Sequence, residues 1–270
     1  MIRNLKNGLG YFKKGLLFFR KNRSLYKFGL IPFLINIILF LVVGWVLIKY
    51  YSPLFNRIIS TLGLQFNVAG SNAMTAQVVS WVFWLLQGFL QVLLGLVLIV
   101  LFLVGMLFVS QIINSPFYEL LSYKTEKLYI KFLDPSFEEV KEPFSLKKSI
   151  RDIFWGIWLE IKKFIFFLVI PLILLIINFI PVIGPLLYTF LSNTFAAFSL
   201  GFNYFSYPFT RKGVLFRRQV LLGLNHRAKL VGFGLPLLVP FFNILFAPLF
   251  VVGGTMLAVD LERNQPEKIQ

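Results

Sequence analysis

Acidic residues are missing from most of this chain. None occurs before Glu119, and none lies between Glu160 and Asp260. Lys and Arg instead gather in three blocks, 3–27, 124–163 and 211–229, which leave 28–48, 58–118, 164–210 and 230–259 without Asp, Glu, Lys or Arg. Because a water-soluble fold needs charge across its surface, most of this chain must face hydrocarbon. The sequence therefore predicts an integral membrane protein whose basic blocks mark the side from which it was inserted.

The chain also has no Cys and a single His, His226. Their scarcity excludes a thiolate nucleophile, a disulfide scaffold and a Cys or multi-His metal site. The apolar runs contain no acidic pair either, so an intramembrane protease or transferase lacks its chemical groups. We expect no catalytic residues, no metal, no cofactor and no enzymatic activity.

The composition that remains is strongly apolar. Of the 270 residues, 58% are hydrophobic, and the mean hydropathy of +0.79 excludes an ordinary soluble domain. The net charge of +16 is a feature of many proteins that bind nucleic acid. Here the basic residues flank apolar runs, as the positive-inside rule describes, so we expect membrane lipids as partners and no nucleic acid.

Residues 2–21 have the periodicity of an amphipathic helix. Apolar residues recur at spacings of three and four and share one helical face: Ile2, Leu5, Leu9, Phe12, Leu16 and Phe19. We expect residues 1–27 to form an interfacial helix on an anionic leaflet, although a core helix of a soluble cap domain would give the same pattern. The first 27 residues lack a signal-peptide core and no cleavage pattern follows the next apolar run, so we expect that run to remain in the mature protein.

Two apolar runs are long enough to cross a bilayer, which takes about 20 residues. They predict long membrane helices at 28–51 and 78–113. The stretch between them, 49–77, holds only Lys49 and Arg57 as cations and is expected to be an outside loop.

The sequence Asn114-Ser115-Pro116-Phe117 predicts the start of a new helix, with Ser115 as N-cap and Pro116 at the first position. The basic segment 114–163 is then a cytoplasmic helical segment. Its acidic residues alternate with Lys, which is typical of solvated helix faces.

The last two apolar runs, 164–206 and 230–259, are interrupted by proline. The first is broken at Pro181–Pro185, and the second by Pro236, Pro240 and Pro248, with an expected apex near Phe242–Asn243. Both runs begin and end beside basic segments, which favours hairpins that return to the side they left. The arm 231–241 would form about 16 Å of helix, roughly half of a ~30 Å hydrocarbon core, so it cannot cross; the arms of 164–206 are of intermediate length.

Uncharged polar residues follow helical spacing in two places. The pore-lining candidates are Gln87, Gln91, Thr189, Ser192, Asn193, Ser199 and Asn203. Their amides and hydroxyls can escort an anion, but the same residue types also pack helices against one another. The hydrocarbon runs hold no carboxylate, so a passive conduit fits better than a proton relay, and any coupling would have to use Glu160 or Asp260 at the membrane edges.

Short motifs containing Pro, Gly or Asn occur along almost the whole chain. They are Phe28 to Asn36, Ile113 to Phe117, Asn178 to Pro185, Tyr204 to Phe209, Gly232 to Gly234, Pro240 through Asn243 to Pro248, and Gly253 to Thr255. In content and order they resemble the CysZ family, the bacterial inner-membrane sulfate transporters, within a wider superfamily of etoposide-induced proteins. The resemblance implies an all-α integral membrane protein with two long transmembrane helices, two partially penetrating helical hairpins and amphipathic cytoplasmic helices. We expect a multi-pass protein of the bacterial inner (plasma) membrane with both termini cytoplasmic.

The resemblance also points to a binding site, because the family carries a Gly-Leu/Ile-Arg-Arg-type motif associated with sulfate before its first membrane segment. The matching positions are Ser24, Leu25, Tyr26 and Lys27, preceded by Arg23. Tyr26 can donate one hydrogen bond but carries no charge at pH 7, and Lys27 lacks the planar fork of Arg. The family implies uptake of sulfate or a related small oxyanion, and we expect a homo-oligomer. A non-transporting membrane scaffold or assembly factor of the same superfamily is the alternative.

Overall fold

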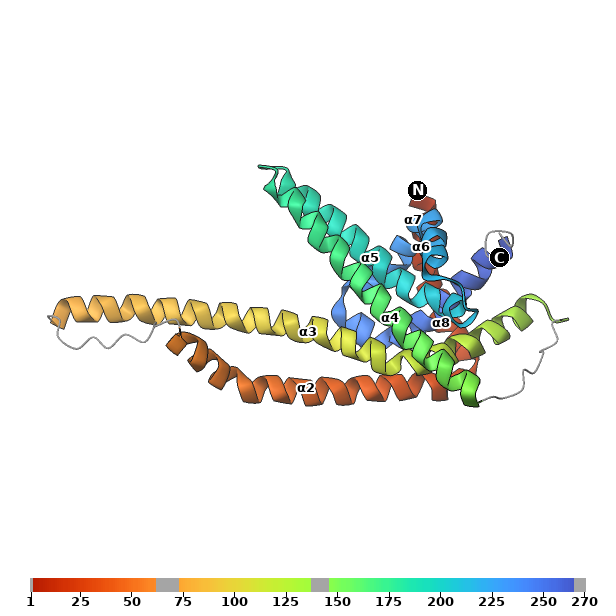
Figure 1. Ribbon diagram of the computed structural model, residues 1–270, viewed down its shortest axis with the longest axis horizontal. Coiled ribbons are helices and arrows are strands. Elements are labelled where there is room, and N and C mark those ends of the chain that lie inside the picture. Colours follow the sequence, from red (N-terminus) through yellow and green to blue (C-terminus); the bar gives the residue numbers. More distant parts are fainter. Residues whose placement is uncertain (1, 62–72, 137–145, 265–270) are drawn as a thin grey trace. The chain divides into compact units, whose positions relative to one another are not determined.

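The computed structural model describes residues 2–61, 73–136 and 146–264, and these are helical apart from short connections, with no strand among them. The prediction of an all-α protein is therefore confirmed. Contacts divide the chain into two units, one comprising Met1–Asn36 and Phe108–Gln270 and the other Ile37–Leu107. The elements run in the order α1 (Ile2–Lys21), η1 (Arg23–Leu25), α2 (Tyr26–Thr61), α3 (Ala73–Leu133), α4 (Leu146–Leu174), η2 (Leu175–Phe179), α5 (Gly184–Arg211), α6 (Phe216–Asn225), α7 (Arg227–Gly234), η3 (Leu235–Leu238) and α8 (Pro240–Asn264) (Figure 1).

The smaller unit is a pair of neighbouring stretches of α2 and α3 (Figure 1). The rings of Phe40 and Phe102 meet edge to face with centroids 5.7 Å apart, and the Tyr51 hydroxyl donates to the Gln91 carbonyl at 2.8 Å. Most other large side chains of this unit are apolar and exposed. Such a surface is stable in contact with lipid and unfavourable in water.

Within the described ranges, three helical stretches are long and apolar enough to cross a membrane. They are Arg23–Thr61, Ser80–Met106 and Leu245–Asn264. Only 11% and 6% of the most apolar windows of the first two are buried within the protein, against 72% for the third. The first two stretches therefore present apolar surface to a surrounding phase, whereas the third is mostly covered by its own chain.

Both long helices extend further than the sequence predicted. Helix α2 continues past residue 51 to Thr61, so the beginning of the expected outside loop is helical. Helix α3 contains Pro116 in its interior, whereas we predicted a new helix with Ser115 as its N-cap. An interior proline costs about 3 kcal/mol. Tertiary contacts on both sides offset this cost, since Asn114 donates to Asn36 Oδ1 at 2.6 Å and Tyr118 is buried.

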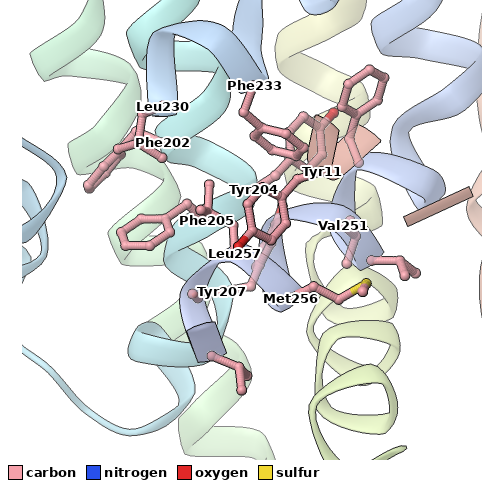
Figure 2. Close-up of a cluster of buried hydrophobic side chains, with 14 of the residues drawn as sticks. Tyr11, Phe202, Tyr204, Phe205, Tyr207, Leu230, Phe233, Val251, Met256 and Leu257 are labelled. Carbon is pink, nitrogen blue, oxygen red and sulfur yellow. The ribbon is translucent and has the colours of Figure 1, made fainter. Parts of the chain in front are cut away.

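The larger unit has one apolar core formed by α1, α5, α7 and α8 with part of α3. Figure 2 shows its buried side chains, among them Tyr11, Phe202, Tyr204, Phe205, Tyr207, Leu230, Phe233, Val251, Met256 and Leu257. Glycines bring the backbones together where these helices cross. A methyl group on Gly234 of α7 would overlap the carbonyl oxygen of Ala197 on α5, and one on Gly8 of α1 would overlap that of Lys229.

Helix α1 forms as predicted, but its buried face differs from the expected apolar face. The buried residues are Gly8, Tyr11 and Gly15, which lie against α7 and α8. Ile2 and Leu9 of the predicted face remain exposed. Helix α1 is therefore part of the folded core. That α1 also lies on a membrane leaflet, with its exposed apolar side chains toward lipid, stays a prediction.

Helices α4 and α5 lie side by side and are joined at a narrow tip (Figure 1). The helical path of α4 tightens into η2 at Leu175, and the chain turns at Pro181–Ile183. Val182 has a φ of 66° and is 93% exposed at this tip. A β-branched residue in the left-handed region is strained, so the flanking proline and helix starts must hold it there. The turn lies where the sequence predicted the break.

The last apolar run is interrupted earlier than predicted. Helix α7 passes into η3, Val239 is extended, and α8 then runs without a break from Pro240 through Pro248. The predicted apex near Phe242–Asn243 and the predicted break at Pro248 both lie inside α8, so these two predictions are wrong. Asn243 is instead buried and accepts a hydrogen bond of 2.5 Å from the Tyr204 hydroxyl, which anchors the first turns of α8 against α5.

Candidate functional site

The residues predicted to bind the anion lie at the junction of α1 and α2. Arg23–Leu25 form η1, and Tyr26 begins α2. Leu25 is fully buried and fixes the junction to the core, while Arg23, Ser24 and Lys27 are exposed. The Leu25 N–H donates to the Asn22 carbonyl oxygen and the Tyr26 N–H to the Arg23 carbonyl oxygen, so η1 occupies these two donors. The positive end of the α2 dipole still favours an anion at this position.

Positive charge is concentrated at the same junction. The last turn of α1 supplies Arg20 and Lys21, and Arg23 and Lys27 follow within a few residues. None of these four cations forms an ion pair with a carboxylate in the described part of the chain. The Lys27 ammonium lies 5.1 Å from the ring centroid of Phe28. An exposed set of cations without internal counter-ions raises the local concentration of anions.

Tyr26 has a structural role within the junction. Its hydroxyl donates to the carbonyl oxygen of Arg20 at 2.9 Å, and its ring stacks on Phe19 with centroids 5.1 Å apart. These contacts close the corner between α1 and α2. The hydroxyl that could donate to an anion is thus already used by a backbone carbonyl.

A buried group of amides and hydroxyls lies further along α2 and α3, within the larger unit. Asn36 Oδ1 accepts hydrogen bonds from Ser110 Oγ and Asn114 Nδ2, each at 2.6 Å, and all three side chains are buried. One turn beyond Asn114, the buried ring of Tyr118 meets the ring of Tyr207 on α5 with centroids 6.1 Å apart. A buried polar group costs free energy unless it is hydrogen-bonded, so the bonds that meet at Asn36 Oδ1 hold these side chains together. Among the described residues, Asn114 Oδ1 and the Tyr118 hydroxyl have no hydrogen-bond partner.

A buried ion pair lies between α4 and α5. The Lys163 ammonium is 2.7 Å from Glu160 Oε1, 3.4 Å from Asn203 Oδ1 and 5.1 Å from the centroid of the Tyr207 ring. Lys163 is 2% exposed and Glu160 6% exposed. We had expected Glu160 to lie on a solvated helix face, and that prediction is wrong because α5 covers this side of α4.

Glu126 is a second carboxylate that is buried against expectation. It pairs with Arg211 at the end of α5, and Lys212 Nζ is 3.0 Å from its Oε1. Burial lowers the pKa of Arg211 to about 10, and the negative charge of Glu119 opposes this shift. Arg211 therefore stays charged at neutral pH. Glu126 is buried because α3 continues into the core of the larger unit instead of ending at the membrane surface.

Asp260, the other edge carboxylate, accepts two phenol hydroxyls. Tyr11 of α1 donates to it at 2.5 Å and Tyr129 of α3 at 3.0 Å. Among the residues with described positions, no group of three or more His, Cys, Asp or Glu side chains could hold a metal ion.

The predicted pore-lining residues fall in different units. Gln87 and Gln91 belong to the smaller unit on α3, and the others belong to α5 in the larger unit: Thr189, Ser192, Asn193, Ser199 and Asn203. The hydroxyls of Thr189 and Ser199 donate to carbonyl oxygens of their own helix at 2.7 and 2.8 Å. Ser199 and Asn203 are buried between helices, while Asn193 is exposed. Hydroxyls bonded to their own helix and amides buried between helices are typical of helix packing. A role for these residues in lining a pore therefore stays a prediction.

Sequence reasoning did not bring Lys163 together with Asn203, or Asn36 with Asn114. One signal was present for Lys163, which is the last charged residue before the uncharged run 164–210. Glu160 and Lys163 are also spaced for one helical face. Asn36 and Asn114 both belong to motifs that carried the family resemblance, but nothing in a single sequence indicates that two distant amides share an acceptor.

Comparisons with known proteins show the family of the chain. A family model described as sulfate transporter CysZ/etoposide-induced protein 2.4 matches residues 11–248. A sulfate transporter CysZ from Pectobacterium atrosepticum is 35% identical over 109 residues, which cover 39% of this chain and 40% of that protein. Another from Pseudomonas paraeruginosa is 30% identical over 193 residues, covering 68% of this chain and 74% of that protein. The chain thus spans less than half of the first relative and about three quarters of the second.

Proposed function

The chain belongs to the sulfate transporter CysZ/etoposide-induced protein family, and on that premise we propose that it is a conduit for the uptake of sulfate or a related small oxyanion into the bacterial cytoplasm. The observation that carries this proposal is the set of cations at the start of α2 that form no ion pair with any carboxylate whose position the structure describes. Two relatives named as sulfate transporters support the same substrate class. In this proposal the protein lies in the inner membrane and works as a homo-oligomer.

The proposed membrane arrangement follows from charge and helix length. Helices α2 and α3 cross the bilayer, and the α4–α5 and α7–α8 hairpins penetrate it only in part. Residues 1–27, 114–163, 207–229 and 260–270 then face the cytoplasm, because the basic blocks lie there. Exposed apolar residues on α2 and α3 support their contact with lipid.

In the proposed binding site, Lys27 and Arg23 supply charge, and the backbone N–H group of Ser24 donates to the oxyanion. The Leu25 N–H, which the family motif would also assign to the anion, donates to the Asn22 carbonyl oxygen at 3.0 Å. Tyr26 adds its hydroxyl only if the hydrogen bond to the Arg20 carbonyl opens. The site is therefore weaker than one built on two Arg side chains, which bind oxyanions in bidentate fashion.

The conduit beyond this site is proposed to use uncharged polar side chains. The candidates within the larger unit are Thr189, Ser192 and Asn193 on α5, and those within the smaller unit are Gln87 and Gln91 on α3. No carboxylate lies in the hydrocarbon runs of the sequence, so flux is expected to be passive and driven by the anion gradient.

Calorimetry and flux measurements on purified protein test this proposal. Charge-assisted hydrogen bonds contribute about 1.5–3 kcal/mol, so Lys27→Ala should weaken sulfate binding by roughly 10- to 150-fold. Tyr26→Arg restores the family pattern and should tighten binding. Lys13→Ala removes an exposed cation from α1 away from the junction and is the matched control. No sulfate binding and no flux through liposomes, in folded protein of every variant, would contradict the proposal.

One observation favours the alternative of a membrane scaffold. Tyr26 replaces a motif Arg and ties α1 to α2 through Arg20 and Phe19, which is a structural use of the position. A scaffold would keep this corner and need no anion. It predicts that Tyr26→Phe lowers stability while sulfate binding is absent in both forms.

A further inference from the structure

Lys163 is the one Lys or Arg side chain classed as buried among the residues whose burial the structure describes. It is enclosed between α4 and α5 by Glu160, Asn203 and Tyr207. We propose that Lys163 is an internal oxyanion-binding subsite, and that the Glu160 carboxylate occupies it until a substrate oxyanion displaces it. This inference rests on the proposed function, because it requires a small oxyanion to reach the core of the larger unit.

Stability alone does not account for the pair. Transferring two charges out of water costs several kcal/mol each, and an apolar pair of similar volume is often as stable or more stable. The surroundings of the ion pair are partly apolar, because Phe167 on the next turn of α4 packs against Phe202 with ring centroids 5.6 Å apart. Apolar side chains would therefore fit at the position of the pair. A charged pair at this position therefore points to a role for the ammonium group.

The groups around the ammonium fit an oxyanion. Carboxylate and sulfate oxygens accept the same charge-assisted hydrogen bonds from an ammonium group, so each can replace the other. The Tyr207 hydroxyl is buried and has no hydrogen-bond partner among the described residues. It is a neutral donor on the side chain whose ring lies beside Lys163. An oxyanion that displaces Glu160 would meet the Lys163 cation, and we assign the Tyr207 hydroxyl as its further donor.

One more carboxylate lies near the subsite and must be considered. A methyl group on Gly156 of α4 would overlap Glu119 Oε1, so Glu119 lies against α4 one turn before Glu160. Its negative charge acts on Arg211, whose positive charge offsets it. Tyr118 and Tyr204, whose rings contact that of Tyr207, are neutral phenols. The net charge that an incoming oxyanion meets is therefore governed by Lys163 and Glu160.

Buried polar and aromatic side chains extend from this subsite to Asn36 in the interior of α2. Tyr207 meets Tyr118 on α3, and Asn114, one turn away on the same helix, donates to Asn36 on α2. Asn36 lies about 13 Å along the helix axis from Lys27. All of these residues belong to the larger unit. The proposed binding site and the proposed subsite are thus linked within one packed body.

Thermal unfolding in sulfate tests the subsite without any need for transport. Glu160→Gln leaves Lys163 as a buried cation without a charged partner, so an anion that binds there should stabilise the variant. We expect its unfolding temperature to rise on the order of 5 °C at sulfate well above the dissociation constant, beyond the rise in the parent. The double variant Glu160→Gln with Lys163→Met lacks both charges and is the matched control. Sulfate stabilises proteins generally, and comparison with this control at equal ionic strength removes that contribution.

Equal sulfate responses of Glu160→Gln and the double variant would overturn the inference. Sulfate flux through liposomes then separates it from the proposed function. Flux in the parent and equally in the double variant would support the conduit and contradict the subsite. Sulfate-dependent stabilisation confined to Glu160→Gln, with no flux through any protein, would support the subsite and contradict the conduit. If Lys163→Met alone does not fold, the double variant still supplies the neutral background.

Discussion

The Tyr11 hydroxyl donates to Asp260 Oδ2 at 2.5 Å, although 249 residues separate them in sequence. Tyr129 donates to the other oxygen of the same carboxylate at 3.0 Å. One carboxylate near the end of α8 therefore holds α1 and the last turns of α3. Burial first, and the hydrogen bond to Asp260 second, raise the pKa of Tyr11 above its ordinary value of 10.0.

This raised pKa makes stability fall at alkaline pH. Above about pH 10 the phenol ionises in the unfolded chain and stays protonated in the folded chain, so the unfolded state is favoured as pH rises. Tyr11→Phe removes this contribution. At neutral pH it should lower the free energy of unfolding by about 1–2 kcal/mol, because Asp260 loses one donor. Denaturation in detergent between pH 8 and 11 should show a shallower decline for Tyr11→Phe, while the exposed Tyr50→Phe control follows the parent. Parallel declines for Tyr11→Phe and the parent would contradict it.

Two glycines of α1 give a matched test of backbone packing. A methyl group on Gly8 would overlap the Lys229 carbonyl oxygen, whereas one on Gly10 would meet nothing within 4 Å. Gly8→Ala must separate α1 from α7 and should destabilise the protein by about 1–3 kcal/mol. Gly10→Ala should be neutral or stabilise it by up to about 1 kcal/mol, because Ala favours the helix. Thermal unfolding of both variants measures the difference. Equal effects would mean that α1 does not pack closely on α7 in the membrane.

The two glycines also show what the sequence could and could not predict about the fold. Helix α1 was predictable because its period of hydrophobic residues is strong. Its buried face was not, because glycine at a helix crossing carries no hydropathy signal. The tip at Pro181–Ile183 was predictable from Pro and Gly, but the continuous passage of α3 through Pro116 depends on tertiary contacts of Asn114 and Tyr118.

The Glu126→Gln variant tests whether a partly buried ion pair stabilises the protein more than an exposed ion pair does. The variant leaves Arg211 and Lys212 without a shared carboxylate at a partly buried position. We expect a loss of about 1–3 kcal/mol, less than the loss for a fully buried pair because both cations are partly exposed. The control is Glu262→Gln, which removes only the exposed pair with Lys212 and should cost less than about 1 kcal/mol. Chemical denaturation of both variants decides this, and equal losses would count against a structural role for Glu126.

The candidate site, like the fold, could be predicted from the sequence only in part. Basic residues at the start of α2 follow from the charge pattern and the family motif. The structural use of Tyr26 does not, because the Arg20 carbonyl that accepts its hydroxyl is defined only by the turn η1. Likewise, the acidic residues near Lys suggested solvated faces, and only the packing of α5 against α3 and α4 reveals Glu126 and Glu160 as buried.

The depth of the two hairpin tips is the sharpest test of the membrane arrangement, and the absence of cysteine from the chain makes single-cysteine labelling direct. Val239, between η3 and α8, is the position for a spin label at the α7–α8 tip, because Asn243 near the expected apex is buried and bonded to Tyr204. If α7 and the first turns of α8 penetrate only partway, a label at Val239 should be quenched most by lipid probes at mid-depth. Labelling from outside would mean that this segment crosses the bilayer. A cysteine at Leu224 on α6, which is exposed and proposed to be cytoplasmic, should react only after permeabilisation and serves as the control.

Labelling of a single cysteine at Val182 decides the depth of the α4–α5 hairpin. Protection from both sides of the membrane supports a tip within the hydrocarbon, and reaction with an impermeant reagent in intact cells means that the hairpin spans.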